Sequence, residues 1–457
     1  MKVFNSITRG MEELKPLADN EIRLYTCGPT VYNFAHIGNF RAYTFEDILR
    51  RVVKFNGMKI RQVMNLTDVD DKTIRGANAA GVALTDYTRT YKDAFFADLK
   101  LLNIEPAEIY PAATDHIPEM IQLVSKLIEC GVAYQSEDGS VYFNVRKFPG
   151  YGKLAHIDFD NQRTGARCAS DEYDKENVGD FALWKAWEES DGPVGWDSPW
   201  GRGRPGWHIE CSAMSMKYLG ETFDLHTGGI DNLFPHHENE IAQAEAATGK
   251  PFVKTWMHCA HLKVNGEKMS KSLGNFFTLR DLLEKGWTGR EIRYVLINAH
   301  YRQGLNFAFS ALEDARKSLE RIDRAVDALA ARINPAEAAP EFAAKALEDF
   351  TAAVNDDLNI PKAFAALFEL VRETNASGTA SQGVLDVFKR MDEVLGIVFF
   401  GKKEAETVPD EIAALLEARA AARASKNWAE SDRLRDEIAA KGWVVKDSKE
   451  GQSCTKK

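Results

Sequence analysis

The sequence predicts an α/β protein, with a parallel sheet, an insertion, an α-helical bundle and a small mixed C-terminal domain. Residues 21–130 alternate short strand-like segments with longer helix-like segments, which is typical of a parallel sheet. From about residue 311, apolar residues recur at alternating steps of three and four, the spacing of a helix with one buried face. A chain of 457 residues exceeds what one hydrophobic core accommodates, so several domains are expected.

Composition favours an ordinary globular protein of the cytoplasm. Hydrophobic residues make up 44% and charged residues 28% of the chain, and no apolar run approaches 18 residues. Residues 1–20 lack the apolar segment of a secretory signal, so no membrane partner is expected. The net charge of −10 provides no general attraction for nucleic acid, so an RNA partner would depend on local basic patches. Six widely spaced cysteines argue against a disulfide framework and leave metal binding or packing.

The first half of the predicted sheet domain comprises residues 1–130. A strand from Ile22 to Thr26 leads through a Gly/Pro turn into a helix from Tyr43 to Phe55. A second strand, from Lys59 to Leu66, ends in an acidic turn that opens another helix, and residues 117–130 form a further helix. Because ligands bind where strands of an open α/β sheet end, the turn after residue 26 is the first place to look for a site.

The second half of the sheet domain follows an insertion at residues 131–205, where short β-like pieces alternate with Gly-rich and charged stretches. Residues 206–265 contain a helix from Trp207 to about Leu219 and a strand from Phe223 to Thr227. A Gly-Gly loop follows that strand, and a helix spans His236 to Thr248. The sequence therefore predicts that both halves contribute strand ends to one sheet edge.

The remaining chain divides into three predicted regions. Residues 266–310 carry a Lys/Ser-rich loop, residues 311–402 are helical with a break at 355–361, and residues 403–457 form a C-terminal domain behind a linker. This last domain is expected to contain two helices and a short strand at 442–445. The helical stripe consists of Leu312, Ala315, Leu319, Ile322, Val326, Leu329 and Ile333.

Four side chains are candidates for a metal site. Cys27 and Cys211 both lie at predicted sheet-end positions, and His236 and Glu240 are four residues apart on one helix face. Two thiolates, an imidazole and a carboxylate form a reasonable Zn²⁺ ligand set. Each residue alone has a commoner interpretation, because a lone Cys is usually buried packing and a His/Glu pair at this spacing is often a surface pair.

Spacing leaves two further histidines open as ligands. His237 is adjacent to His236, and His208 lies three residues before Cys211. The remaining cysteines, Cys130, Cys168, Cys259 and Cys454, have no clear chemical partner in the sequence, and packing is the simplest role for the first three.

Two motifs are candidates for binding phosphate. His36-Ile37-Gly38-Asn39 places an imidazole and an amide one helical turn apart at a predicted strand-to-helix turn. Lys268-Met269-Ser270-Lys271-Ser272 places two cations around small hydroxyl residues, which suits a charged transition state. The simpler interpretations are a helix cap for the first motif and a solvated loop for the second.

Together these motifs resemble the class I aminoacyl-tRNA synthetases, and the surrounding residues narrow the resemblance to the cysteinyl-tRNA synthetases. The resemblance covers essentially the whole chain. It implies a Rossmann-type catalytic domain, a stem-contact region at 266–310, and a C-terminal anticodon-binding domain. The matching segments are 27–32, 65–72, 206–212, 234–240, 268–275 and 356–361.

The resemblance also implies a role for each candidate residue. Zinc would be held by Cys27, Cys211, His236 and Glu240 and would take the thiolate of the substrate cysteine. The cysteine pocket would be lined by Gly28, Thr67 and Trp207, and ATP would be bound by His36, Gly38, Asn39, Gly228, Gly229, Asp231 and Lys271. Catalysis would rest on His36, Asn39, Lys268 and Lys271, with Mg²⁺ accompanying ATP. The family motif commonly ends in His where this chain has Asn39.

The implied reaction converts L-cysteine and ATP into cysteinyl-adenylate and pyrophosphate and then transfers the cysteinyl group to the terminal adenosine of tRNA(Cys), with a monomer as the expected form. Candidate tRNA contacts in the C-terminal domain are Arg423, Trp428, Arg433, Arg435 and Trp443. The usual Trp near the family's C-terminus is absent, and Cys454 lies in that region. Two alternatives are a cysteine ligase of mycothiol synthesis, which would not need residues 403–457, and an inactive paralogue, which would not need an intact 268–272 loop.

Overall fold

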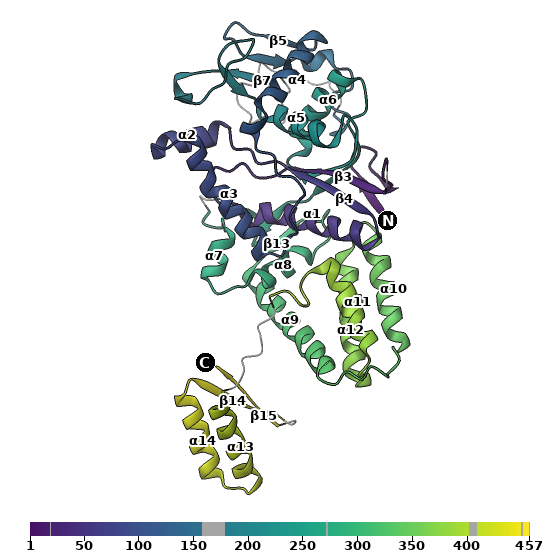
Figure 1. Cartoon of the computed structure of the whole chain (residues 1–457), viewed down its shortest axis with the longest axis vertical. Coiled ribbons are helices and arrows are strands. Elements are labelled where there is room, and N and C mark those ends of the chain that lie inside the picture. The colour runs from purple at the N-terminus through teal and green to yellow at the C-terminus, as the bar shows by residue number, and fades with distance from the viewer. Residues whose placement is uncertain (19, 158–178, 271–272, 402–408, 449–450, 457) are drawn as a thin grey trace. The chain divides into compact units, whose positions relative to one another are not determined.

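The computed structural model describes residues 1–18, 20–157, 179–270, 273–401, 409–448 and 451–456. The chain folds into two compact units, Met1–Phe400 and Gly401–Lys457. The first unit contains the sheet domain, the inserted region and a helical bundle, and the second contains two helices and a β-hairpin (Figure 1). Across the described ranges, no helix is both long enough and apolar enough to cross a bilayer.

A four-stranded parallel sheet with the order β10-β9-β3-β4 lies at the centre of the first unit. Its strands are β3 (Glu21–Thr26), β4 (Lys59–Met64), β9 (Phe223–Gly229) and β10 (Val253–Cys259). Thr26 aligns with Met64 on one side and with Thr227 on the other, so these strands end at one edge. The predicted parallel α/β sheet is confirmed, and β10 is an additional strand that the sequence did not indicate.

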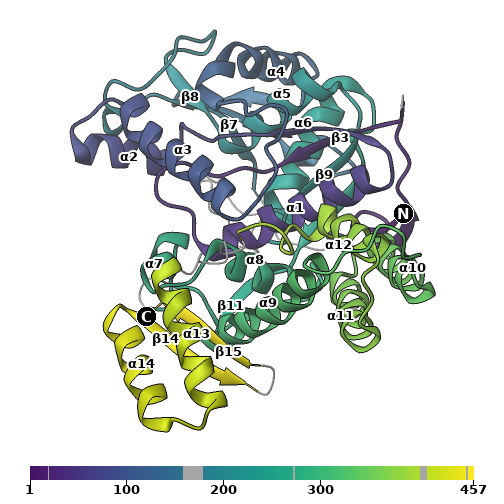
Figure 2. The ribbon, with the colours of Figure 1, turned by 60° about the horizontal axis from the view of Figure 1, so that its bottom comes forward.

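Helices cover both faces of this sheet, with α1 on one side and α4, α5 and α6 on the other (Figures 1 and 2). Side chains of successive strand residues enter different cores, because a strand alternates its faces. Leu24 and Met64 belong to the core around α1, whereas Tyr25 and Val63 belong to the core around α4 to α6. The helices are α1 (Ile37–Phe55), α2 (Asp71–Ala80), α3 (Leu84–Leu101), α4 (Ile117–Glu129), α5 (Trp207–Leu219), α6 (Glu238–Thr248), α7 (Leu279–Glu284) and α8 (Gly289–Ile297).

The inserted region forms an antiparallel sheet with the order β5-β6-β7-β8. Its strands are β5 (Ala133–Gln135), β6 (Val141–Phe143), β7 (Phe181–Ala186) and β8 (Gly203–Pro205). Phe143 and Phe181 stack with their ring centroids 5.0 Å apart in the adjoining core. Because β8 leads almost directly into α5, this sheet fixes the start of the helix that carries Trp207 and Cys211. Cys168 lies outside the described residues.

Smaller sheets complete the first unit. The hairpin of β1 (Lys2–Asn5) and β2 (Gly10–Glu13) precedes the main sheet, and β11 (Leu262–Val264), β12 (Glu267–Lys268) and β13 (Leu305–Phe307) form a sheet with the order β12-β11-β13. This second sheet carries the start of the Lys/Ser-rich loop.

The helical bundle packs against α1 through α12, in the same core as one face of the sheet. It consists of α9 (Phe309–Ala330), α10 (Glu341–Asn355), α11 (Ile360–Ser377) and α12 (Gln382–Leu395). Arg293 on α8 is fully buried there and donates hydrogen bonds to the backbone carbonyls of Leu395 (2.8 Å) and Leu102 (3.0 Å). The same guanidinium contacts Asp47 on α1 at 2.6 Å, so one side chain ties the bundle to the sheet domain.

The C-terminal unit contains α13 (Asp410–Ala424), α14 (Trp428–Ala440), β14 (Trp443–Ser448) and β15 (Gly451–Lys456). Its core includes Ile412, Ile438, Trp443 and Val445. The two helices and the first strand were expected, whereas β15 was not. Arg419 is buried and forms a two-pronged ion pair with Asp447, which fixes α13 to the hairpin.

Candidate functional site

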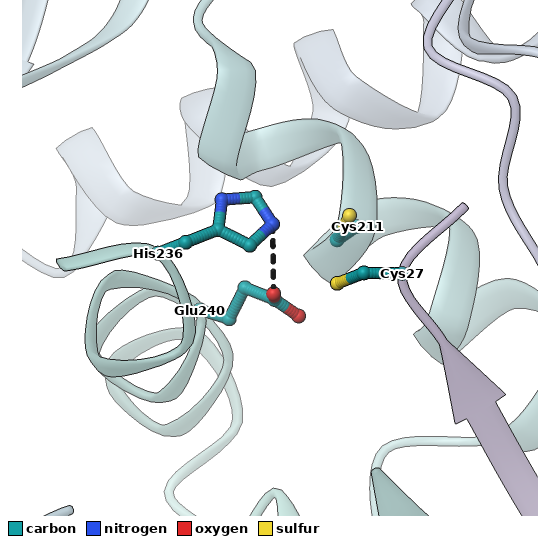
Figure 3. A group of neighbouring side chains, drawn as sticks. All are labelled: Cys27, Cys211, His236 and Glu240. Carbon is teal, nitrogen blue, oxygen red and sulfur yellow. Dashed lines mark ion pairs between the residues drawn. The ribbon is translucent and has the colours of Figure 1, made fainter. Parts of the chain in front are cut away.

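Four side chains from different elements meet at the carboxyl edge of the sheet (Figure 3). Cys27 directly follows β3, Cys211 lies on α5, His236 lies in the short helical segment η4 (Leu233–His237), and Glu240 lies on α6. One ligand atom from each lies within 4.8 Å of the others. Cys27 is half-buried and the other three residues are buried, so Cys27 is the most exposed member of the cluster.

The electrostatics of this cluster suit a cation. Burial lowers the pKa of His236 to about 3, so its imidazole is neutral and has a lone pair to offer. The Oε1 atom of Glu240 is buried 3.2 Å from His236 Nε2, yet it accepts no hydrogen bond from any described residue. A hydrogen bond with Cys211 and burial raise the pKa of the Cys27 thiol. The donor set of two S, one N and one O fits Zn²⁺.

A second group of donors overlaps the first. Cys27, His226, His237 and Glu240 also place their ligand atoms within 4.8 Å of one another, so the choice between His236 and His237 that spacing left open persists in the geometry. His208 is different, because its Nδ1 atom lies 2.8 Å from Nδ1 of His236 and it belongs to neither group. Nothing in the sequence pattern indicates His226, which lies within β9, because only the fold brings it to Glu240.

The first phosphate motif forms the N-terminal cap of α1. The backbone N–H of Asn39 donates to His36 Nδ1 at 3.2 Å, and the backbone N–H of His36 donates to Asn39 Oδ1 at 3.1 Å. This reciprocal pair starts α1 at Ile37, six residues before the predicted start at Tyr43. It also determines which atoms remain for a ligand. His36 keeps its proton on Nε2 because Nδ1 is an acceptor, and Asn39 keeps its Nδ2 amide.

Burial lowers the pKa of His36, while the negative charge of Asp231 acts in the opposite direction. A neutral imidazole with Nε2–H is therefore the form that faces the site at pH 7. Asp231 lies just beyond β9, and the backbone N–H of Ile230 donates to the carbonyl of Cys259 at 2.8 Å, which holds this turn against β10. The candidate adenosine residues Gly228, Gly229 and Asp231 are thus at the same sheet edge as His36.

The second motif begins beside the first. A Cβ atom on Gly38 would lie 2.9 Å from the ring of His36 and 3.0 Å from Cε of Met269, so the loop approaches the start of α1 closely at this glycine. Lys268 is exposed at the end of β12, and Lys271 lies outside the described residues. The loop returns to α1 after residue 272, because the backbone N–H of Ile37 donates to the carbonyl of Phe277 at 3.0 Å. Both ends of the loop are therefore anchored near His36.

The candidate amino-acid pocket adjoins the metal cluster. The indole ring of Trp207 stacks on His236 with a centroid distance of 4.1 Å. Thr67 donates to the carboxylate of Glu210 at 2.8 Å, which holds the end of β4 near α5. A Cβ atom on Gly28 would lie 1.8 Å from the carbonyl oxygen of Asn65, so the chain after β3 can approach the chain after β4 only with glycine there.

In the C-terminal unit the five candidate RNA contacts differ in their surroundings. Trp428 is 57% exposed, and the guanidinium of Arg423 lies 5.9 Å from its ring centroid. Arg433 is engaged by Glu430 and Glu437, at 2.7 and 2.9 Å. Trp443 is buried in the small core, which favours a packing role. Trp428 is thus the best-exposed stacking surface among the five.

Comparisons with known proteins bear on this site. The family model of the class I (C) tRNA synthetase catalytic domain matches residues 13–317. The DALR domain matches residues 349–400, and the cysteinyl-tRNA ligase anticodon binding domain matches residues 405–454. The cysteine–tRNA ligase of Protochlamydia amoebophila is 51% identical over 464 residues, which cover 99% of this chain and 97% of that protein. The chain belongs to the cysteine–tRNA ligase family.

A second relative agrees with this family, and solved structures agree with the fold. The cysteine–tRNA ligase of Chlamydia muridarum is 46% identical over 99% of both chains. The fold is similar to that of Mycobacterium tuberculosis methionyl-tRNA synthetase in complex with methionyl-adenylate, with a TM-score of 0.59 and 16% identity over 83% of this chain and 90% of that chain. A LeuRS of Agrobacterium radiobacter K84 gives a TM-score of 0.58 and 12% identity over 84% of this chain and 85% of that chain. The predicted class I synthetase fold and family are confirmed.

Proposed function

We propose that this member of the cysteine–tRNA ligase family activates L-cysteine with ATP and transfers it to the 3′-terminal adenosine of tRNA(Cys). The observation that carries this proposal is that a thiol-rich donor cluster and the cap of α1 both follow strands of one sheet, at its carboxyl edge. The cluster can select a thiol-containing amino acid, and the cap can bind phosphate at the same sheet edge. Full-length similarity to named cysteine–tRNA ligases supports it.

In the first step the carboxylate oxygen of cysteine bonds to the α-phosphorus of ATP, and the bond from that phosphorus to the bridging oxygen breaks to release pyrophosphate. The Nε2–H of His36 and the Nδ2 amide of Asn39 would donate to phosphate oxygens as negative charge shifts. Lys268 and Lys271 would neutralise the leaving pyrophosphate, and Mg²⁺ would accompany ATP. Asp231, Gly228 and Gly229 would hold the adenosine. These groups position the substrates and stabilise the developing charge, so no enzyme nucleophile is needed.

Selection of cysteine over serine would rest on the four-donor cluster. Cys27, Cys211, His236 and Glu240 would hold zinc, which when bound supplies a soft Lewis acid that prefers a thiolate to a hydroxyl. A pocket that reads shape alone discriminates poorly between side chains differing in one atom. Trp207, Thr67 and Gly28 would confine the amino acid next to this cluster.

In the second step a ribose hydroxyl of the terminal adenosine attacks the cysteinyl carbonyl, and AMP leaves. The C-terminal unit would bind the anticodon, with Trp428 and Arg423 offering a stacking surface and a cation, and Arg433 and Arg435 adding positive charge. We infer that the protein acts in the cytoplasm, since tRNA charging takes place where ATP and tRNA are available. We also infer that it is a monomer with the domain boundaries predicted from the sequence.

The test is a charging assay with ATP, Mg²⁺, labelled cysteine and total bacterial tRNA, scored as acid-precipitable label. Label from cysteine but not from serine supports the proposal. Cysteine-dependent exchange of pyrophosphate into ATP without labelled tRNA would show that adenylation is right and the acceptor is wrong. No exchange at all, in protein with its zinc bound, would contradict the activity.

A further inference from the structure

A chain of hydrogen-bonding side chains leads from the metal cluster to the N-terminal hairpin. Nε2 of His237 lies 3.3 Å from the sulfur of Cys27. Nδ1 of the same ring lies 2.9 Å from Nε2 of His258 on β10, and Nδ1 of His258 lies 2.7 Å from the hydroxyl of Ser6 in the β1–β2 turn. His237 and His258 are buried and Ser6 is half-buried, so the chain runs from the site to the edge of the unit.

The direction of these hydrogen bonds depends on the sulfur. A neutral imidazole has one donor and one acceptor nitrogen, so a chain of two imidazoles can be ordered only from Ser6 toward Cys27 or the reverse. A cysteine that binds a metal is a thiolate and cannot donate. With the cluster loaded, therefore, Ser6 O–H donates to His258, His258 Nε2–H donates to His237, and His237 Nε2–H donates to the sulfur.

We infer that His237 is a fixed hydrogen-bond donor to the Cys27 thiolate rather than a ligand of the metal, and that Ser6 and His258 hold it in this tautomer. The inference rests on the proposed metal centre. It resolves the ambiguity between the two overlapping donor groups, because a ring whose Nε2 carries a proton cannot coordinate through that atom. The set with Cys211 and His236 then holds the ion.

Such a donor has two measurable consequences. Hydrogen bonds to ligating groups orient them, and their loss typically lowers metal affinity about 10- to 100-fold. An N–H donor also stabilises the sulfur lone pairs, so its removal shifts the sulfur-to-metal charge-transfer band of a Co²⁺-substituted protein to lower energy. A residue that served only to fill space would lower stability without moving this band.

The experiment measures Zn²⁺ affinity by competition with a chelator, and the Co²⁺ spectrum, in the full chain carrying His237→Phe. We expect an affinity about 10- to 100-fold weaker, a charge-transfer band at lower energy, and unchanged intensity of the tetrahedral d–d bands. His237→Gln keeps an N–H donor and should recover part of the affinity. Ser6→Ala should weaken Zn²⁺ binding less, about two- to fivefold, because the histidines are then no longer held in one tautomer while His237 can still donate to the sulfur.

Thr8→Ala is the matched control, because Thr8 lies in the same turn and its hydroxyl donates to Glu12 at 2.5 Å, away from the chain of histidines. Far-UV circular dichroism verifies folding of each variant. Affinity within twofold of the wild type and an unmoved band in His237→Phe would overturn the inference, and so would loss of the tetrahedral d–d intensity, which would make His237 a ligand. Wild-type affinity in Cys211→Ser would instead remove the proposed centre itself.

Discussion

Asn39→Asp separates the two roles that the cap of α1 gives to one side chain. The amide oxygen accepts the backbone N–H of His36 at 3.1 Å, and none of the described residues accepts a hydrogen bond from the amide nitrogen. Aspartate keeps an oxygen for the cap and is favourable near a helix N-terminus, but it replaces the free donor with a negative charge. Stability should therefore persist while phosphate binding fails.

The magnitude follows from the lost interaction. A hydrogen bond to a charged group contributes about 1.5–3 kcal/mol, which corresponds to a fall in kcat/KM for ATP of about 10- to 150-fold, and charge repulsion from phosphate adds to this. Asn39→Ala loses both roles, so it should lower the free energy of unfolding by about 1 kcal/mol. It should also lower kcat/KM for ATP, but less than Asn39→Asp, because alanine carries no negative charge to repel the phosphates.

The assay is cysteine-dependent pyrophosphate exchange at varied ATP, with thermal unfolding measured alongside. We expect the thermal midpoint of Asn39→Asp to lie within about a degree of the wild-type midpoint. Its kcat/KM for ATP should be lower than that of Asn39→Ala. An Asn39→Asp enzyme with kcat/KM within twofold of the wild type would refute the assignment of the amide nitrogen to phosphate.

Four further predictions follow from other parts of the molecule. Cys211→Ser should lower bound zinc, measured by elemental analysis, and raise the KM for cysteine; normal zinc and kinetics would exclude Cys211 from the site. Arg293→Met removes the donor to buried backbone carbonyls and one partner of Asp47, which still accepts from Arg51, and it should lower the urea-unfolding free energy of the first unit by about 1–3 kcal/mol, with no measurable loss as the contrary result. Trp428→Ala should raise the KM for tRNA several-fold and leave pyrophosphate exchange unchanged, whereas an unchanged KM would remove the stacking contact. Burial lowers the pKa of His258 from 6.5 to about 3, so the unfolded chain takes up the proton first; stability from this group is complete above pH 6.5 and declines as the pH falls toward 3. The thermal midpoint of the metal-free wild type should therefore fall more steeply between pH 7.5 and 5 than that of metal-free His258→Gln, and identical pH dependence in the two would contradict this prediction.

The fold class was predictable because strand and helix periods differ, and the buried stripe of α9 follows its predicted spacing. The start of α1 could not be predicted, because its cap is made by His36 and Asn39 acting together, and an imidazole at the N-cap is not a usual start signal. Strand β10 is buried along both faces at most positions, so it lacks the alternation that marks a half-buried strand.

The candidate site shows the same division. Cys27, Cys211, His236 and Glu240 could be proposed from residue type, from strand ends and from helical spacing, and the structure brings them together. The roles of His226, His258 and Ser6 could not be proposed, because their contacts join residues far apart in the chain and no local pattern records such a contact. Tertiary structure alone creates that part of the site.

The pairing of β3 with β9 has a consequence for the integrity of a cleaved chain. These strands come from the two sides of the inserted region, and their parallel ladder is continuous with β4 and β10. The cluster of Cys27 with Cys211, His236 and Glu240 spans the same junction. A protease cut within the insertion would therefore yield two fragments that co-purify as one particle. They would be held together by the backbone hydrogen bonds between β3 and β9 and by a site to which each fragment contributes.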